Sequence, residues 1–597
     1  MQKLTTILDC EVYKDYFLAQ FLETSTGKII AFEQFDGQPL DVDRLGRFLR
    51  QYRLVTFNGA NFDLPVLAVA LTGADCARIK QACDAIINRG YRAWQFEQAW
   101  GIKIPRTDHI DLIEVAPGIA SLKIYGGRLG CPKMQDLPIP PESSIPPEMH
   151  GILREYCAND LTTTLALYNK LKPQIDLRES MGKEYDIDLR SKSDAQIAEA
   201  VISHEVERIA GWKIDRPQVP PGTVYKYRVP SFIYFTSAPL QAKLREILDA
   251  DFVVLDNGSV AEPEALKGKT VKIGAGVYRL GIGGLHSSET CQAVEADDDH
   301  VLVDRDVASY YPAIILRTAL APKQMGTAFT KVYDSIVQRR LEAKKAGHKV
   351  AADALKITIN GSFGKFGSPY SRLYSPDLLI QTTVTGQLAL LMLIESLEAA
   401  GISVASANTD GIVIRCHRKD LQAMEILVKR WEQQTGFDTE ETHYRALYSR
   451  DVNNYVAIKP DGSVKLKGAY APAGLMKNPT GQVVIDAVVA YLTAGVPLAE
   501  TIRACSDITR FATIRTVKGG AVDQHGNYLG KAVRWYYSSG VTGPLRYKVN
   551  GYTVARSDGA RPMMDLPEQF PSDIDFDWYE REALSVLSDS GAVGGLI

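Results

Sequence analysis

The chain has 597 residues, of which 45% are hydrophobic and 23% are charged, and its net charge is −3. This length predicts about three to five domains. The composition excludes a disordered chain, a collagen-like repeat and a disulfide-stapled miniprotein. No run of eighteen apolar residues occurs and no signal peptide is visible, so neither a membrane span nor secretion is expected. The eight scattered cysteines contain no C-x-x-C pair, which is typical of reduced thiols in a cytoplasmic protein without a zinc site.

The first 180 residues alternate predicted strands and helices. Three stretches rich in β-branched and aromatic residues predict a meander of strands over 4–12, 16–24 and 28–35. A further strand begins at Arg53 and leads through an Asn-Gly turn into an apolar helix that opens at Asp63. The periodic apolar residues of 153–171 predict another helix.

Four acidic residues of this region are expected to meet. Asp9 and Glu11 are two apart on a strand and therefore face the same side of the sheet. Asp63 follows the next strand, and Asp160 lies four residues after Tyr156 on one helical face. Four carboxylates at one place repel each other unless two divalent metal ions, about 4 Å apart, neutralise them.

The patterns D-x-E, N-G-x-x-F-D and Y-x-x-x-D resemble the three motifs of the DEDDy 3′–5′ exonucleases. The resemblance implies metal ligands at all four acids and a role for Tyr156 in orienting or deprotonating the attacking water. It also implies contacts to single-stranded DNA from Asn58 and Phe62. Lys123 is interpreted either as a ligand of the scissile phosphate or as an ordinary surface lysine.

A basic segment lies in the middle of the chain. Between Lys331 and Arg372 there are nine Lys or Arg residues and three acids. A linker is expected over 178–192, and a helix follows it. The basic segment reads as a helical hairpin with arms at about 331–345 and up to Gly367. Arg340 and Lys344 share a face of the first arm. On the second arm, one face is formed by Lys356, Asn360 and either Phe363 or Gly364.

Two further acids lie on predicted strands at either side of this hairpin. Asp306 is carried by the strand HVLVDRDV, on which its neighbour Asp304 reads as a solvated residue at the strand's edge. Asp410 lies at the tip of a strand–turn–strand segment. Cations that both hairpin arms present inward are suited to binding a triphosphate.

The segments D306-V-A-S-Y-Y-P, K356-I-T-I-N-G-S-F-G and S406-A-N-T-D-G resemble motifs A, B and C of the family B DNA polymerases. The resemblance implies that Asp306 and Asp410 bind the metals and that Tyr311 excludes a ribose 2′-OH. Arg340, Lys344 and Lys356 would bind the triphosphate, while Asn360 and Phe363 would shape the pocket for the nascent base pair. The implied cofactors are two Mg²⁺ ions per active site, with Mn²⁺ as an alternative.

Three positions depart from the family pattern. Asn408 replaces the first Asp of D-T-D, and Gly281 replaces the tyrosine of the Y-x-G-G turn. The K-x-Y primer-binding motif keeps Tyr455 but loses its lysine. Lys465 and Lys467 are interpreted as replacing that lysine in the primer contact.

The short intervals between the three motifs predict priming from a nucleic-acid 3′ end, without a terminal-protein primer, and weak strand displacement. The expected fold class is a multidomain α/β and α+β protein in which an RNase H-like exonuclease domain precedes a right-hand polymerase. The predicted domains are the exonuclease (1–180), a linker and N-terminal palm (181–320), the fingers hairpin (321–367), the palm (368–480) and the thumb (481–597). Alternating aromatic and basic residues near 534–548 are interpreted either as a duplex-gripping surface of the thumb or as a β-rich core.

The resemblance implies primer–template DNA and dNTPs as partners, and allows a helicase, a clamp or a single-strand-binding protein. A monomer in the cytoplasm of a bacterial host, of bacteriophage or mobile-element type, is expected. Asn408 leaves open an exonuclease-dominated enzyme with an impaired polymerase site. A non-catalytic DNA-binding scaffold is disfavoured, because six acids at metal positions would repel one another without metals.

Overall fold

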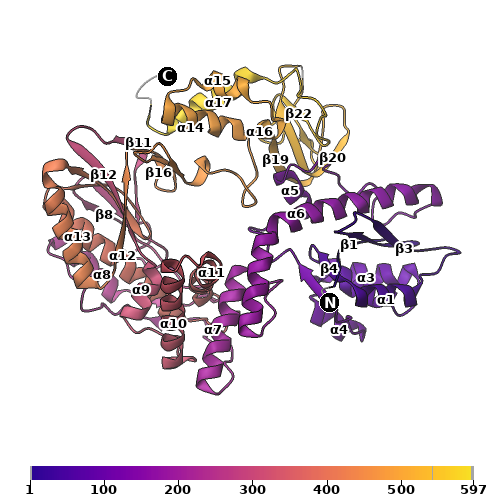
Figure 1. Ribbon diagram of the computed structural model, residues 1–597, viewed down its shortest axis with the longest axis horizontal. Coiled ribbons are helices and arrows are strands. Elements are labelled where there is room, and N and C mark those ends of the chain that lie inside the picture. Colours follow the sequence, from indigo (N-terminus) through magenta and orange to yellow (C-terminus); the bar gives the residue numbers. More distant parts are fainter. Residues whose placement is uncertain (1–2, 541, 593–597) are drawn as a thin grey trace. The chain divides into compact units, whose positions relative to one another are not determined.

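A computed structural model describes residues 3–540 and 542–592 and contains two compact units (Figure 1). Unit 1 comprises Met1–Ser193, Ala473–Val484 and Ala499–Glu580. Unit 2 comprises Asp194–Pro472, Ile485–Leu498 and Arg581–Ile597. Both units combine sheets with helices, so the predicted multidomain α/β and α+β class is confirmed. The five predicted domain boundaries remain predictions.

A five-stranded sheet in the order β3-β2-β1-β4-β5 organises the N-terminal part of unit 1. The meander of β1 (Thr5–Val12), β2 (Tyr16–Glu23) and β3 (Ile29–Phe35) is antiparallel, as predicted. The two remaining strands, β4 (Arg53–Thr56) and β5 (Asp108–Asp111), run parallel to β1.

Helices cover this sheet through two apolar clusters. One cluster contains side chains of α1 (Val42–Gln51), α2 (Asp63–Ala70), α3 (Cys76–Arg89) and α4 (Ala93–Trp100). The other contains side chains of α5 (Leu122–Arg128) and α6 (His150–Tyr185). Every residue of α2 is buried, which explains why its sequence is apolar without helical periodicity.

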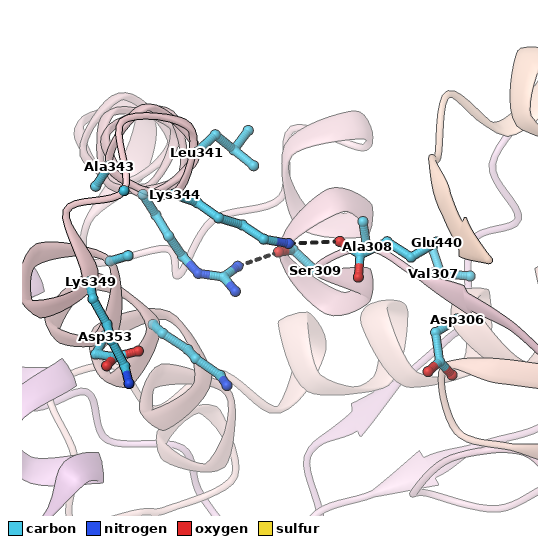
Figure 2. Close-up of a pocket in the computed structure, with 14 residues that line it drawn as sticks. Asp306, Val307, Ala308, Ser309, Leu341, Ala343, Lys344, Lys349, Asp353 and Glu440 are labelled. Carbon is cyan, nitrogen blue, oxygen red and sulfur yellow. Dashed lines mark hydrogen bonds and ion pairs between the residues drawn. The ribbon is translucent and has the colours of Figure 1, made fainter. Parts of the chain in front are cut away.

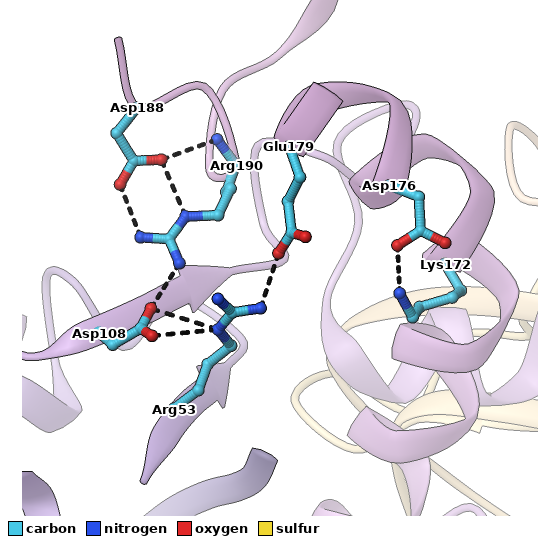
Figure 3. Close-up of polar contacts among 7 residues, drawn as sticks. All are labelled: Arg53, Asp108, Lys172, Asp176, Glu179, Asp188 and Arg190. Carbon is cyan, nitrogen blue, oxygen red and sulfur yellow. Dashed lines mark hydrogen bonds and ion pairs between the residues drawn. The ribbon is translucent and has the colours of Figure 1, made fainter. Parts of the chain in front are cut away.

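The predicted linker over 178–192 is wrong in its first half, because α6 continues to Tyr185. Arg178 is buried, and its guanidinium donates to the carbonyls of Gln174 and Lys192. The ion pairs of Figure 3 hold the same region: Arg53 of β4 pairs with Asp108 of β5 at 3.2 Å and with Glu179 of α6 at 2.7 Å. Charged residues thus bind the end of α6 to the sheet.

Three further ion pairs in Figure 3 belong to the same part of the chain. Arg190 pairs with Asp188 at 2.8 Å and with Asp108, and Lys172 pairs with Asp176 one turn along α6. Asp108 is thereby shared by two arginines, which lower its pKa although burial raises it. The segment after α6 is held to β5 by this carboxylate.

A second sheet of unit 1, in the order β21-β19-β20-β22, contains the aromatic and basic residues near 534–548. β19 (Thr513–Val522) pairs with β20 (Tyr528–Tyr537), flanked by β21 (Arg546–Tyr547) and β22 (Ala560–Pro562). The β-rich core interpretation is correct for four successive residues, which are at most 5% exposed: Arg534, Trp535, Tyr536 and Tyr537. The duplex-gripping interpretation is wrong for them, because buried side chains cannot contact a DNA backbone.

Unit 2 is built on a seven-stranded sheet in the order β15-β12-β14-β13-β10-β9-β8. Its central strands are β12 (His300–Val307), β13 (Ser403–Asn408) and β14 (Gly411–His417), with β15 (Thr439–Tyr444) at one edge. A second sheet holds β11 (Thr290–Glu295), β16 (Ala446–Asp451), β17 (Asn454–Ile458) and β18 (Val464–Leu466).

The helix α12 (Pro376–Ala399) forms the core of unit 2 together with the seven-stranded sheet. Among the described residues it is the one helix that is long and apolar enough to cross a membrane, and 89% of its most apolar stretch is buried. Most residues of α12 are buried, as expected for a central helix.

The basic hairpin is confirmed as two antiparallel helices, α10 (Gly326–Lys345) and α11 (Lys349–Phe366), joined by a turn over 346–348. Both pack against α7 (Asp194–Ala210), and the three helices lie side by side in Figure 1. The approach is close at Gly361, where a Cβ atom would lie 2.5 Å from the carbonyl oxygen of Asp194. A glycine is therefore required at this position for α7 to support the hairpin.

Candidate active sites

The four acids predicted for the first site come together in unit 1. Asp9 and Glu11 project from β1, Asp63 begins α2, and Asp160 lies on α6. Three of them are less than 9% exposed: Glu11, Asp63 and Asp160. Strand alternation places Asp9 and Glu11 on one face of the sheet, as the sequence predicted.

Mutual repulsion and burial dominate the electrostatics of this cluster. Burial raises the pKa of Asp9, Glu11 and Asp160 above the ordinary range, and repulsion between the carboxylates adds to the shift at Asp9 and Glu11. Burial and the nearby carboxylate of Asp111 raise the pKa of Asp63 to about 7. The cluster is therefore unfavourable in its ionised form without cations.

The donor set of this cluster fits divalent cations. Asp63 Oδ1 is buried and has no hydrogen-bond partner among the described residues. Ligand atoms of Asp9, Glu11 and Cys157 all lie within 4.8 Å of one another. Cys157, which donates to Asp9 Oδ2 at 3.6 Å, is a neighbour of the acids that the sequence reasoning missed. It directly follows Tyr156 in the Y-x-x-x-D pattern.

Lys123 is part of the cluster, and the alternative of an ordinary surface lysine is wrong. Its Nζ atom forms an ion pair with Asp160 and lies 4.3 Å from the centre of the Tyr156 ring. Tyr156 is 6% exposed, and burial together with the surrounding carboxylates raises its phenol pKa strongly. The phenol is therefore neutral at physiological pH and acts as a hydrogen-bond donor.

Asn58 and Phe62 lie on the loop between β4 and α2, beside the acids. Asn58 adopts a left-handed conformation with φ of 68°. The carboxylate of Asp111 holds the loop, accepting hydrogen bonds from the backbone N–H groups of Asn58 (2.7 Å) and Ala60 (2.9 Å). Asp111 is buried at the end of β5 and was missed by sequence reasoning, since no motif marks it.

The two acids predicted for the second site also come together, in unit 2. Asp306 lies on β12, directly opposite Gly411 of β14, and Asp410 lies in the turn between β13 and β14. A Cβ atom at position 411 would lie 2.1 Å from Asp306 Oδ1, so the glycine makes room for this carboxylate. Partial desolvation and repulsion by Asp306 raise the pKa of Asp410, as expected for two acids that share a cation site.

Asn408 has a structural partner that an aspartate could not have. Its side-chain Nδ2 donates a hydrogen bond of 2.9 Å to the carbonyl of Val452 in the turn between β16 and β17. Its Oδ1 accepts from the Thr409 hydroxyl at 3.1 Å. Because a carboxylate cannot donate, the amide links the turn that carries Asp410 to the second sheet.

The prediction that Asp304 is a solvated strand-edge residue is wrong. Asp304 is 4% exposed, and β12, which is flanked by both β14 and β15, is not at the edge of its sheet. Its Oδ2 accepts a 2.5 Å hydrogen bond from the Tyr444 hydroxyl and lies 3.1 Å from Lys465 Nζ. Lys465 Nζ is also 3.3 Å from Asp306 Oδ2.

A pocket of about 510 Å³ separates Asp306 from the helical hairpin. Figure 2 shows Asp306 at one side and Lys344 and Lys349 at the other. Its lining includes all three predicted triphosphate ligands and one lysine that sequence reasoning missed: Arg340, Lys344, Lys356 and Lys349. Arg340 donates to the Ser309 hydroxyl at 2.6 Å, and Lys344 pairs with Glu440 at 2.9 Å.

Asp306 also lines a second pocket, of about 270 Å³, together with Asp410, Asn408, Tyr455 and Lys467. Lys467 Nζ lies 5.8 Å from the centre of the Tyr455 ring. Two of the three residues predicted to contact a primer, Tyr455 and Lys467, are thus adjacent to the acids. Lys465, by contrast, is paired with Asp304 and Asp306 and is not directed at a separate phosphate site.

Tyr311 and Phe363 form a stacked pair with ring centres 4.1 Å apart. Burial and the nearby Asp410 raise the pKa of Tyr311 to about 12, so this tyrosine lies close to the acids. Asn360 is exposed on α11, three residues from Phe363, and Lys356 is exposed one turn before Asn360. The predicted face of α11 is therefore present beside the pocket.

Comparison with known proteins supports one relationship. No family model matches the chain. The chain is 26% identical over 132 residues to DNA polymerase 1 of Sulfolobus acidocaldarius and 30% identical over 132 residues to DNA polymerase 1 of Aeropyrum pernix. These matches cover 22% of this chain but only 15% and 14% of the two relatives. That part of the chain is therefore homologous to archaeal DNA polymerases.

A solved structure, the family B DNA polymerase from the hyperthermophilic archaeon Pyrobaculum calidifontis, matches across this whole chain and 79% of its own, with 15% identity and a TM-score of 0.42.

Proposed function

We propose that this chain is a family B DNA polymerase that extends the 3′-OH of a nucleic-acid primer with dNTPs on a DNA template. The observation that carries the proposal is the pocket in which Asp306 faces Arg340, Lys344 and Lys356. Homology of part of the chain to archaeal DNA polymerases supports the same conclusion. We also propose that the acid cluster of unit 1 is a 3′–5′ proofreading exonuclease.

The charged residues of the polymerase site determine what it can bind. Asp306 and Asp410 would hold two divalent metal ions, Mg²⁺ or Mn²⁺, which activate the primer 3′-OH and neutralise the leaving pyrophosphate. The cations of α10 and α11 bind the triphosphate and orient it for in-line attack. Lys344 is paired with Glu440 in the free protein and exchanges this partner for a phosphate when the nucleotide binds.

The stacked rings of Tyr311 and Phe363 give the sugar pocket a fixed wall. A tyrosine that is immobilised by stacking cannot move aside for a ribose 2′-OH, which supports selection of deoxynucleotides. Asn360 and Phe363 border the nascent base pair, and Tyr455 and Lys467 contact the primer strand.

In the exonuclease site, Asp9, Glu11, Asp63 and Asp160 would hold two metal ions that activate water and stabilise the leaving 3′ oxygen. Tyr156 remains protonated and orients the attacking water. Lys123 neutralises Asp160 in the free protein and would bind the scissile phosphate once that carboxylate binds a cation. Asn58 and Phe62 hold the single-stranded 3′ end.

The proposed partners are primer–template DNA and dNTPs in a bacterial cytoplasm, with a helicase, clamp or single-strand-binding protein as further candidates. Priming from a nucleic-acid 3′ end is supported by the short interval between motifs A and B. From Gly326 to Phe366 this interval is filled by the hairpin of α10 and α11. It contains no further insertion for a protein primer.

The test is primer extension on a recessed, 5′-labelled primer–template with Mg²⁺, with and without dNTPs. Asp306→Ala abolishes lengthening but keeps shortening, whereas Asp9→Ala abolishes shortening and keeps lengthening. Shortening alone in the presence of all four dNTPs would contradict the polymerase assignment. Lengthening without any shortening by wild type would contradict the exonuclease assignment.

A further inference from the structure

One lysine and one buried acid of unit 2 have no role in the mechanism above. Asp304 precedes Asp306 by two residues on β12, so both side chains lie on the same face of the sheet. Lys465, on β18, places its Nζ atom 3.1 Å from Asp304 and 3.3 Å from Asp306. The ammonium group therefore bridges a buried carboxylate and a carboxylate of the proposed metal site.

Asp304 is held firmly while Asp306 is not. The Asp304 side chain is 6% exposed and also accepts the Tyr444 hydroxyl, whereas the Asp306 side chain is 48% exposed. A buried carboxylate is stable only when it is paired and hydrogen-bonded. Asp304 and Tyr444 therefore fix the position of Lys465, and the contact with Asp306 is the one that can be exchanged.

We propose that Lys465 is an internal counter-ion of the polymerase site, which neutralises Asp306 before a metal ion binds and is retained by Asp304 when the metal ion takes its place. This inference rests on the proposed function, since it assumes that Asp306 binds metal. Lys465 and Asp304 are positioning residues in this arrangement: they set the metal affinity of the site without contacting substrate.

The counter-ion also accounts for how this site accommodates Asn408. The pocket that contains Asp306 and Asp410 is also lined by Lys465 and Lys467. With the neutral Asn408 as their neighbour, the three carboxylates of this pocket, Asp304, Asp306 and Asp410, face two ammonium groups. A metal ion must therefore compete with lysine for Asp306, and removal of Lys465 removes that competition.

The test measures Mn²⁺ binding to the full chain by electron paramagnetic resonance, without DNA or nucleotide. Asp9→Ala and Asp63→Ala are introduced throughout so that the exonuclease cluster does not contribute. Lys465→Met lowers the Kd for Mn²⁺ about five- to twentyfold, since a competing unit charge in direct contact is lost. Lys465→Arg keeps the Kd within about twofold of the parent, because the charge remains.

Lys459→Met is the matched control, because this lysine lies on the same β17–β18 hairpin beside Asp461. It leaves the Kd unchanged. Asp304→Asn raises the Kd severalfold in the parent and much less in the Lys465→Met background, because Asp304 acts through the lysine. Additive effects of the two substitutions would contradict the anchoring role of Asp304.

Two outcomes separate this inference from the proposed function. If Asp306→Ala leaves Mn²⁺ binding unchanged, the proposed metal site and the counter-ion are both wrong. If binding depends on Asp306 but Lys465→Met leaves the Kd unchanged or raises it, the counter-ion alone is wrong. Circular dichroism of each variant checks that the fold is retained.

Discussion

The two acid clusters differ in where their charge is neutralised. In unit 1, Glu11, Asp63 and Asp160 are buried, and Lys123 is the lysine in contact with them. In unit 2, Asp306 and Asp410 are at the surface of open pockets, and lysines line the same pockets. The unit 1 cluster concentrates negative charge in a buried region of low dielectric constant. In unit 2, lysines beside the acids partly neutralise their charge.

This difference predicts that bound metal ions have different roles in the two units. Burial raises the pKa values of the unit 1 acids, so bound cations should stabilise the fold of unit 1. The acids of unit 2 are more exposed, and Asp306 is paired with Lys465, so metal ions should act there on the reaction more than on the fold. Four predictions test this contrast.

The largest effect is expected for Asp410→Asn. The substitution keeps the size of the side chain but removes a metal ligand charge, and a loss of about 4 kcal/mol in transition-state stabilisation corresponds to roughly 10³-fold in rate. We expect primer extension to fall at least about 10³-fold in single-turnover assays, while the melting temperature changes little.

Exonuclease activity of the same protein is the internal control for this variant. It should remain within about twofold of wild type, because the acids of unit 1 are unchanged. A comparable fall in both activities would mean that the two clusters are not independent.

The second prediction concerns the pH dependence of stability in EDTA. The pKa of Asp63 is raised from its ordinary value to about 7, so the folded state retains a proton that the unfolded chain loses near pH 4. The stabilising contribution is complete below pH 4 and is lost as the pH rises towards 7. For Asp63 alone it is on the order of 4 kcal/mol.

Differential scanning calorimetry in EDTA should therefore show a melting temperature that falls between pH 5 and pH 7.5. Asp63→Asn should flatten this slope, and Mg²⁺ should raise the wild-type melting temperature most at the upper end of the range. An identical slope in wild type and Asp63→Asn would refute the assignment.

The third prediction tests the cation-lined pocket. Arg340 lines the pocket on α10, so Arg340→Ala should lower kcat/KM for dNTP about 10²-fold, as expected for loss of one charge-assisted contact worth about 1.5–3 kcal/mol. Lys331→Ala removes an exposed charge from the same helix outside the pocket and should leave kcat/KM unchanged. Equal losses in both variants would indicate a general electrostatic effect, with no specific contact.

The positions that sequence reasoning predicted correctly are those fixed by local geometry. Asp9 and Glu11 share a face because strands alternate, and Arg340 and Lys344 share a face because helices repeat every 3.6 residues. Such relations depend on short stretches of chain and are visible without the fold.

The wrong predictions depend on tertiary contacts. Asp304 reads as solvated until β15, which carries Tyr444, is known to pair beside β12. Arg534 reads equally as a DNA ligand or a core residue until its guanidinium is seen to donate to the carbonyls of Cys131 and Met563. Lys465 is 161 residues from Asp304 in sequence, so no local pattern relates them. Long-range pairing of charges is what the sequence alone does not reveal.

The smallest effect is expected for Asn408→Asp, the change that restores the family pattern. An aspartate cannot donate to the Val452 carbonyl, and an unpaired carbonyl costs about 1–3 kcal/mol when it is shielded from water. The added carboxylate also repels Asp410. We therefore expect a melting temperature lower by a few degrees and a severalfold lower extension rate, both measured with saturating Mg²⁺.

Asn408→Ala serves as the comparison, since it removes the donor without adding a charge and should share the loss of stability but not the repulsion. A faster polymerase after Asn408→Asp would mean that the missing charge limits this site and that the amide tether is dispensable.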